Sequence, residues 1–245
     1  MDLSVVIPAR DEAGNLEPLL VEIGRVLGER LAYEVIVVDD GSADDTGRDL
    51  ARARAAHPRL RVLRHDRHRG QSAALAAGVR AARASWVVTL DGDGQNDPAD
   101  ILRLLAARDA PGRRPDLRLI CGWRRRRRDG PVRRVSSGVA NTFRAAILRD
   151  QTPDTGCGLK LFPRDVFLAL PAFDHMHRFL PALVRRDGGS VLFVEVRHRP
   201  RRHGRSKYGI RDRLWVGILD TFGVLWLGRR TLLTTFREVT DKWPG

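Results

Sequence analysis

Apolar and polar positions alternate along the first ninety residues in a way that predicts strands and helices in turn. Residues 3–8, 33–39, 60–65 and 86–90 are predicted strands, and the almost continuously apolar run at 33–39 is typical of a strand covered on both faces. Between them lie three stretches with helical spacing or composition: residues 15–27, the stretch after the second strand that ends at residue 57, and residues 72–84. Strands that alternate with helices predict an α/β protein with a mostly parallel sheet flanked by helices.

The pattern changes after about residue 109. A linker rich in proline, glycine and arginine at 111–115 precedes a predicted strand at 117–122, a helix at 131–150 and a strand at 191–196. An apolar run follows at 214–227. We expect one domain over residues 1–212 and a separate C-terminal segment over residues 213–245.

Composition narrows the class of partner. The 44 lysines and arginines exceed the 30 acidic residues by 14, which indicates an anionic partner. The 42% of hydrophobic residues is enough for a folded core. Two cysteines form no disulfide framework, and the histidines and cysteines lack the spacing of a zinc site. The sequence also lacks the glycine-rich phosphate loop of nucleotide triphosphatases.

Acidic residues follow the predicted strands of this basic chain. Asp39 and Asp40 end the second strand, and Asp91 and Asp93 follow the fourth. Ligands of open α/β sheets bind at the carboxyl ends of strands, where like charges need a cation or hydrogen-bond donors. Each motif alone could be a turn, and Ser42 could cap a helix. Together they predict a site for Mg²⁺ or Mn²⁺ and a nucleotide.

Five short motifs occur in an order along the chain that is specific to one family of proteins. They are Pro8-Ala9-Arg10-Asp11-Glu12, Asp39-Asp40-Gly41-Ser42, Asp91-Gly92-Asp93-Gly94-Gln95, Asp154-Thr155-Gly156-Cys157 and the stretch from Arg201 to Tyr208. The set resembles the family 2 glycosyltransferases of GT-A fold over roughly residues 3–225, and is most similar to the polyprenyl-phosphate (dolichol-phosphate mannose synthase-like) branch. This resemblance implies a GT-A domain, and the apolar run at 214–227 with its basic flanks adds an amphipathic helical extension at its C-terminal end.

The resemblance also implies roles for individual residues. It places the donor nucleotide at Pro8, Arg10, Glu12, Val38, Asp40, Asp91, Gly92 and Arg124. It assigns the metal ion, Mg²⁺ or Mn²⁺, to Asp93 and Gln95. It places the acceptor phosphate at Arg124, Arg133 and Ser137, and a loop closing over the diphosphate at Arg201 and Lys207. Arg10 stands where relatives often carry tyrosine.

The implied reaction is an inverting transfer of a sugar from a nucleoside-diphosphate sugar to a polyprenyl phosphate. The catalytic set is then Asp93, Asp154, Arg201 and Lys207. An acceptor phosphate is already an anion near neutral pH, whereas a sugar hydroxyl needs a general base, for which Asp154 is the candidate. A soluble transferase acting on a saccharide hydroxyl is therefore the alternative. Nucleic acid is not an expected partner, because the acidic strand ends would repel its backbone.

The apolar run at 214–227 indicates where in the cell the protein is expected to lie. Its 14 residues, with arginines on both sides, are too few to span a bilayer but suit a helix in the headgroup region of an anionic membrane. A core helix or an oligomer contact is the alternative. We expect a cytoplasmic protein held peripherally at the cytoplasmic face of the membrane. An integral-membrane partner or a second copy of the chain could add to the anchoring.

Overall fold

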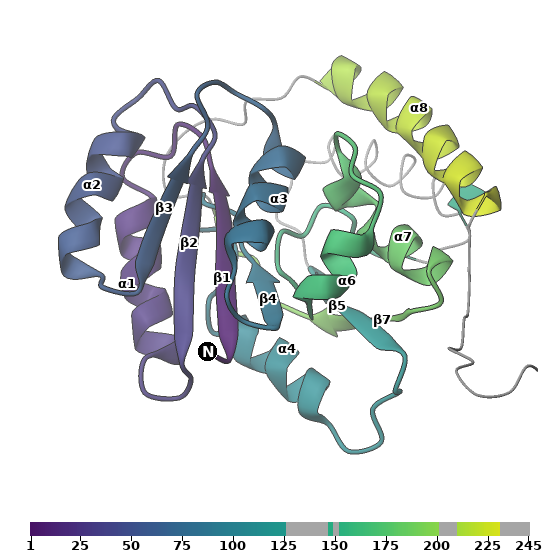
Figure 1. The fold of residues 1–245 in the computed structure, drawn as a ribbon, viewed down its shortest axis with the longest axis horizontal. Coiled ribbons are helices and arrows are strands. Elements are labelled where there is room, and N and C mark those ends of the chain that lie inside the picture. Colours follow the sequence, from purple (N-terminus) through teal and green to yellow (C-terminus); the bar gives the residue numbers. More distant parts are fainter. Residues whose placement is uncertain (126–146, 149–151, 201–209, 231–245) are drawn as a thin grey trace, which may run out of the picture.

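Helices cover both faces of one mixed sheet in the computed structural model, which describes residues 1–125, 147–148, 152–200 and 210–230 (Figure 1). The strands are β1 (Leu3–Ala9), β2 (Tyr33–Asp39), β3 (Leu60–Arg64), β4 (Trp86–Thr89), β5 (Leu117–Trp123), β6 (Lys160–Pro163) and β7 (Ser190–Glu195). The helices are α1 (Leu16–Leu27), α2 (Thr46–Ala56), α3 (Gln71–Ala81), α4 (Asp100–Asp109), α6 (Arg164–Ala169), α7 (Leu180–Arg186) and α8 (Ile210–Arg229), with a 3₁₀ turn, η1, at Met176–Arg178.

The strand order in space is β3-β2-β1-β4-β6-β5-β7. The first four of these strands are parallel, and β6 runs antiparallel to both of its neighbours, β4 and β5. Strand β7 closes the far edge, parallel to β5. The predicted mostly parallel sheet is therefore confirmed. The antiparallel strand β6 was not predicted, nor were α4, α6 and α7.

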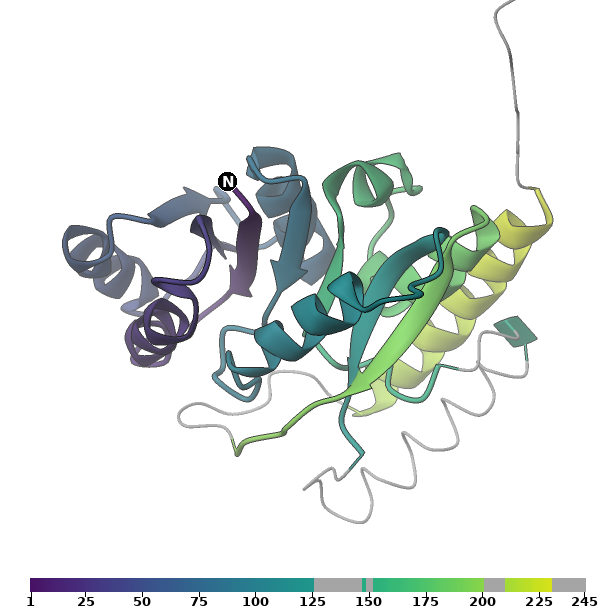
Figure 2. The same cartoon turned by 90° about the horizontal axis from the view of Figure 1, so that it is seen from below.

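The core lies in two layers, one on each face of the sheet. Helices α1, α2 and α4 pack on one face, and α3, α6 and α7 pack on the other (Figure 2). The predicted apolar face of α1 is buried: Leu16, Leu19, Leu20, Ile23 and Leu27. Helix α3 approaches the sheet so closely that a Cβ on Gly78 would lie 2.4 Å from a methyl group of Val6. Only glycine allows this close approach of α3 to the middle of β1.

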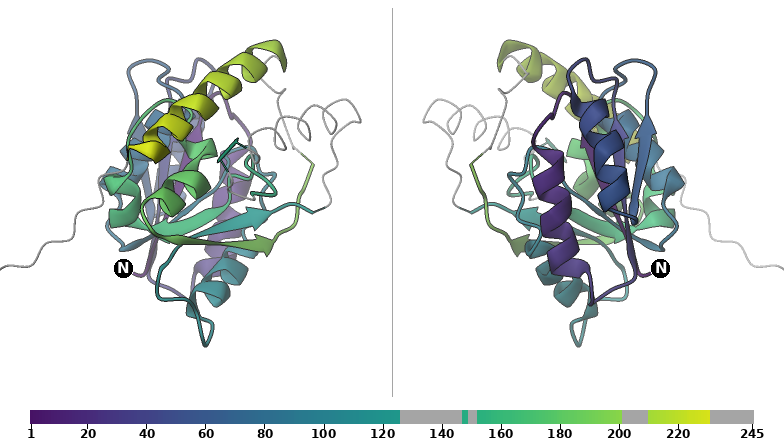
Figure 3. Two further views of the ribbon diagram at one scale, coloured as in Figure 1. Left: turned by 90° about the vertical axis from the view of Figure 1, so that its right-hand side faces the viewer. Right: turned by 90° about the vertical axis from the view of Figure 1, so that its left-hand side faces the viewer.

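Helix α8 packs against α7 on the outside of the second layer (Figure 3). Thr221 and Val224 face inward and are buried. Two polar contacts fix the helix further: His175 Nδ1 lies 3.1 Å from Asp220 Oδ2, and Arg186 Nε donates to the carbonyl oxygen of Leu227 at 3.1 Å.

Helix α8 covers the apolar run expected to be helical, while residues 231–245 lie outside the described residues. The domain division at residue 212 stays a prediction, as does the helix at 131–150, of which the structure describes only residues 147–148. None of the helices in the described ranges combines the length and apolar character needed to cross a bilayer.

Candidate active site

The ends of β1, β2 and β4 meet at one edge of the sheet, as the sequence predicts. Ala9 pairs with Asp39, and the backbone N–H of Asp40 donates to the carbonyl oxygen of Ala9 at 2.8 Å. On the other side of β1, the N–H of Leu90 donates to Val6 at 3.1 Å. The parallel register therefore places the motifs that follow these three strands beside one another.

Asp91 stands in the middle of this edge. Its backbone N–H donates to Asn96 Oδ1 at 3.1 Å, and its Oδ1 accepts a hydrogen bond from Gln71 Nε2 at 3.2 Å. Burial and the neighbouring charge of Asp93 raise the pKa of Asp91 to about 6, although the positive charges of Lys160 and Arg124 oppose this rise. Two carboxylates held this close repel each other, and a bound cation would relieve that repulsion.

Asp93 and Gln95 lie in the turn that follows. Asp93 is buried, and its Oδ1 accepts a hydrogen bond from the backbone N–H of Gln95 at 3.1 Å. Carboxylate and amide oxygens are the ligands that Mg²⁺ and Mn²⁺ prefer. Within the described ranges, no group of three or more His, Cys, Asp or Glu side chains could hold a metal. The residues present fit an ion that takes one or two protein ligands and completes its shell with water and substrate phosphates.

Asp40 holds a neighbouring loop in place. One carboxylate oxygen lies 2.7 Å from His65 Nδ1 and accepts the N–H of Arg69 at 2.8 Å; the other lies 2.6 Å from His68 Nδ1 and accepts the N–H of Gly70 at 2.9 Å. Burial opposes ionisation, but these hydrogen bonds outweigh it and lower the pKa of Asp40. Asp40 therefore ties the loop at 65–70 to the end of β2, where the donor nucleotide was predicted to bind.

The other residues predicted to contact the donor nucleotide differ in how far they are exposed at this edge. Arg10 is exposed at the end of β1 and lies 3.8 Å from Asp11. Glu12 accepts a hydrogen bond from Asn15 at 2.7 Å, and Pro8 is half-buried in the same segment. Val38 is completely buried in the core, so the structure does not bring its side chain to this surface. Gly92 is buried, with the carbonyl oxygen of Pro8 3.2 Å from where a Cβ would stand.

Arg124 and Asp154 form a buried bidentate ion pair. Nε and Nη2 of Arg124 donate to the two oxygens of Asp154 at 2.7 and 2.9 Å, and the side chains are only 8% and 2% exposed. The N–H of Gly156 also donates to Asp154, at 3.1 Å. Burial alone would lower the pKa of Arg124, but the bond to Asp154 raises it. Asp154 is thus engaged in holding a guanidinium beside Asp91, an arrangement that favours an anchoring role over that of a general base.

Two residues of this edge, Lys160 and Gln71, were not predicted. Lys160 lies buried in β6 and donates from Nζ to the carbonyl oxygen of Cys157, and Gln71 opens α3. Neither belongs to a motif, so only the fold reveals them. The predicted contacts at Arg133, Ser137, Arg201 and Lys207 lie outside the described residues and stay predictions.

Comparison with known proteins places this arrangement in a family. A family model described as Glycosyl transferase family 2 matches residues 4–170, more than half of the chain. The chain belongs to glycosyl transferase family 2. The predicted family and the predicted enzyme class, a glycosyltransferase, are therefore confirmed.

Two relatives within this family show how far the similarity extends. Over 240 residues the chain is 37% identical to dodecaprenyl-phosphate galacturonate synthase from Rhizobium johnstonii. The aligned region covers 94% of this chain and 68% of that protein. Over 210 residues it is 32% identical to undecaprenyl-phosphate 4-deoxy-4-formamido-L-arabinose transferase from Aeromonas hydrophila. This aligned region covers 85% of this chain and 63% of that protein. The chain thus spans only about two thirds of the length of these relatives.

A solved structure supports the fold. Glucosyl-3-phosphoglycerate synthase from Mycobacterium tuberculosis, crystallised with Mn²⁺, uridine diphosphate and glucosyl-3-phosphoglycerate, superimposes with a TM-score of 0.69. The match covers 91% of this chain and 80% of that one, at 21% sequence identity. It confirms the predicted GT-A fold for this family 2 glycosyltransferase.

Proposed function

We propose that this chain transfers a sugar from a nucleoside-diphosphate sugar to a polyprenyl phosphate, with inversion at the anomeric carbon. In this reaction an oxygen of the acceptor phosphate forms a bond to the anomeric carbon as the bond to the β-phosphate of the donor breaks. Both relatives described above carry names of polyprenyl-phosphate sugar transferases. The observation that carries the proposal is the Asp91–Asp93 carboxylate pair beside the buried Arg124.

Asp93 and Gln95 are the residues proposed to hold a divalent metal ion. When bound, Mg²⁺ or Mn²⁺ would stabilise the negative charge of the leaving diphosphate. The structural neighbour was crystallised with Mn²⁺ in one complex and with Mg²⁺ in another. Asp91 and Gly92 are proposed to lie next to the diphosphate or ribose, and Arg201 and Lys207 are proposed to bind the diphosphate.

The state of Asp154 favours a phosphate acceptor over a hydroxyl. A sugar hydroxyl would need a general base, and the carboxylate expected to serve as one is bound to Arg124 through both oxygens. A phosphate monoester has a second pKa of about 6 and needs only to be positioned. We propose that Arg124, held in place by Asp154, positions it together with Arg133 and Ser137.

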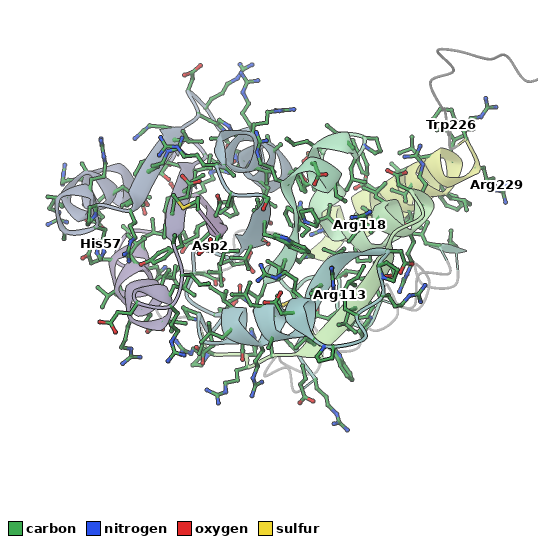
Figure 4. All side chains as sticks on the ribbon, turned by 60° about the horizontal axis from the view of Figure 1, so that its bottom comes forward. Asp2, His57, Arg113, Arg118, Trp226 and Arg229 are labelled. Carbon is green, nitrogen blue, oxygen red and sulfur yellow. The ribbon has the colours of Figure 1, made fainter. Side chains whose placement is uncertain are left out.

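Helix α8 supplies a surface that suits a lipid acceptor. Leu219, Phe222 and Trp226 are 69%, 51% and 58% exposed, and their spacing of three and four residues puts them on one side of the helix. Figure 4 shows Trp226 and Arg229 together at the end of α8, and Arg230 lies over the Trp226 ring at 5.4 Å. We propose that this side lies in the headgroup region of an anionic membrane, at its cytoplasmic face.

A donor panel tests the proposal. Radiolabelled UDP- and GDP-sugars, including a UDP-linked uronic acid, are incubated with Mg²⁺ or Mn²⁺ and either undecaprenyl phosphate or an oligosaccharide. The proposal expects label in the organic phase only when undecaprenyl phosphate is present. Label transferred to the oligosaccharide, with none in the lipid phase, would instead establish the saccharide transferase.

A further inference from the structure

Arg199 links two carboxylates that come from distant parts of the chain. Its Nη1 donates to Glu22 of α1 at 2.5 Å, and its Nη2 lies 2.8 Å from Asp97, four residues beyond Asp93. The side chains of Asp97 and Glu22 are only 6% and 18% exposed, and that of Arg199 is 33% exposed. Isolated exposed ion pairs contribute little, but this three-membered, partly buried set can hold a loop in one geometry.

The backbone around Arg199 is bound to the same loop. The N–H of Arg199 donates to the carbonyl oxygen of Gln95 at 3.0 Å, and Asn96 forms an antiparallel bridge with His198. Two residues earlier, the N–H of Arg197 donates to Asp100 at 2.7 Å. The segment at 197–199 is therefore paired with the loop at 95–100 along its whole length.

This pairing also orients the side chain of Gln95. Its Nε2 donates to the carbonyl oxygen of Arg199 at 3.5 Å. Because the amide group is planar, Oε1 is the atom turned away from Arg199, and an oxygen is what a hard cation takes from an amide. On the other side of the turn, the N–H of Gln95 donates to Asp93. Gln95 is thus held between Asp93 and Arg199.

We propose that Arg199 is a positioning residue for the metal site: clamped by Glu22 and Asp97, it fixes the Asp93–Gln95 turn in the geometry that binds the divalent ion. This inference rests on the proposed function, since it takes Asp93 and Gln95 as the metal ligands. Residues that orient metal ligands commonly change metal affinity by about 10- to 100-fold when they are removed.

Electron paramagnetic resonance of Mn²⁺ tests the proposal without a turnover assay. Free Mn²⁺ is titrated with the full chain in the presence of whichever of UDP and GDP the wild type binds. We expect Arg199→Ala and Asp97→Asn to weaken Mn²⁺ binding by about 10- to 100-fold. Arg199→Lys keeps the charge and one of the two contacts, so it should fall between Arg199→Ala and the wild type.

Arg197→Ala is the matched control. Arg197 also faces Asp97, at 3.6 Å, but its side chain is 65% exposed and its backbone bond to Asp100 survives the substitution. It should bind Mn²⁺ as the wild type does. Folded Arg199→Ala protein with unchanged Mn²⁺ affinity, or an equal loss in Arg197→Ala, would overturn the positioning role. A wild type that binds no Mn²⁺ with either nucleotide would instead overturn the proposed function.

Discussion

The carboxylate of Asp91 lies directly on the backbone of Gly158. A Cβ at position 158 would come within 2.3 Å of Cγ, Oδ1 and Oδ2 of Asp91. The carbonyl oxygen of Gly158 in turn accepts a hydrogen bond from Thr89 Oγ1 at 2.5 Å, at the end of the strand that leads to Asp91. The position of this carboxylate therefore depends on the absence of a side chain at a residue 67 positions further along the chain.

Gly158→Ala should displace Asp91 without unfolding the protein, because a carboxylate at the end of a side chain can move aside. Displacement of a group in the site by about 1 Å can cost about 100-fold in rate, so we expect kcat/KM to fall by about 10- to 100-fold. Gly223→Ala, in α8 where a Cβ meets no atom within 4 Å, is the control and should keep wild-type activity. Full activity in Gly158→Ala would show that the position of Asp91 is unimportant.

Asp154→Asn tests whether Asp154 anchors Arg124 or acts as a base. Removal of one charge from a buried ion pair costs about 3 to 5 kcal/mol, so Tm should fall and transfer should slow. An anchoring role predicts that the pH–rate profile keeps its shape in the variant. The loss of an ionisation from that profile, with Tm unchanged, would establish a general base.

Asp116→Asn provides the control for that experiment. Asp116 forms a bidentate pair with Arg114 at 3.1 and 2.9 Å, but on an exposed loop. Its substitution should leave both Tm and transfer as in the wild type.

Charge placed on the exposed side of α8 should weaken membrane binding. We expect Leu219→Glu and Phe222→Glu each to reduce co-sedimentation with phosphatidylglycerol vesicles by about tenfold or more, since tenfold corresponds to about 1.4 kcal/mol and burial of one large apolar side chain contributes more. Val21→Glu introduces the same charge at a residue of α1 that is 53% exposed, and should bind like the wild type. Equal binding by all of these proteins would exclude α8 from the membrane contact, and a protein partner would then be the expected ligand of its exposed side.

Glu34 gives the stability of the fold a pH dependence. Burial alone would raise the pKa of this carboxyl, but hydrogen bonds from Arg61, Ser4 and the N–H of Arg83, at 2.6 to 2.7 Å, lower it below its ordinary value of 4.5. A carboxyl whose pKa falls on folding stabilises the protein above its unfolded pKa and loses that contribution as the pH drops through its folded value.

Glu34→Gln should therefore lower the free energy of unfolding at pH 7 by about 1 to 3 kcal/mol, and by less at pH 3. Chemical denaturation at both pH values measures the difference, with Glu29→Gln, at an exposed position, as the control for the loss of one charge. A deficit of the same size at pH 3 and pH 7 would contradict the role of ionised Glu34.

The first half of the fold could be predicted because its signals are local. Strands β1, β2 and β4 are short apolar runs, β3 carries three apolar residues among five, and the leucines of α1 recur at helical spacing. Strand β6 could not be predicted in this way: it has four residues and pairs antiparallel with β4, which lies more than seventy positions earlier in the sequence. Helix α4 was missed although its buried Ile101, Leu104 and Leu105 recur at helical spacing.

The same limit applies to the site. The acidic motifs at the strand ends were visible because each directly follows an apolar run. Arg124 and Asp154 were both singled out, but as separate contacts to substrate, because a pairing across thirty residues leaves no local pattern. The clamp on Arg199 joins residues 22, 97 and 199, and only the folded chain brings them together.

The metal site is tested by the Mn²⁺ dependence of sugar transfer to undecaprenyl phosphate, measured for the wild type and Asp93→Asn after treatment with a chelator. We expect the transfer activity of the chelated wild type to fall to background and to recover as Mn²⁺ is restored, while Asp93→Asn, folded by circular dichroism, stays at background throughout. Full transfer by the metal-free wild type, or by Asp93→Asn, would show that no metal ion at Asp93 is needed.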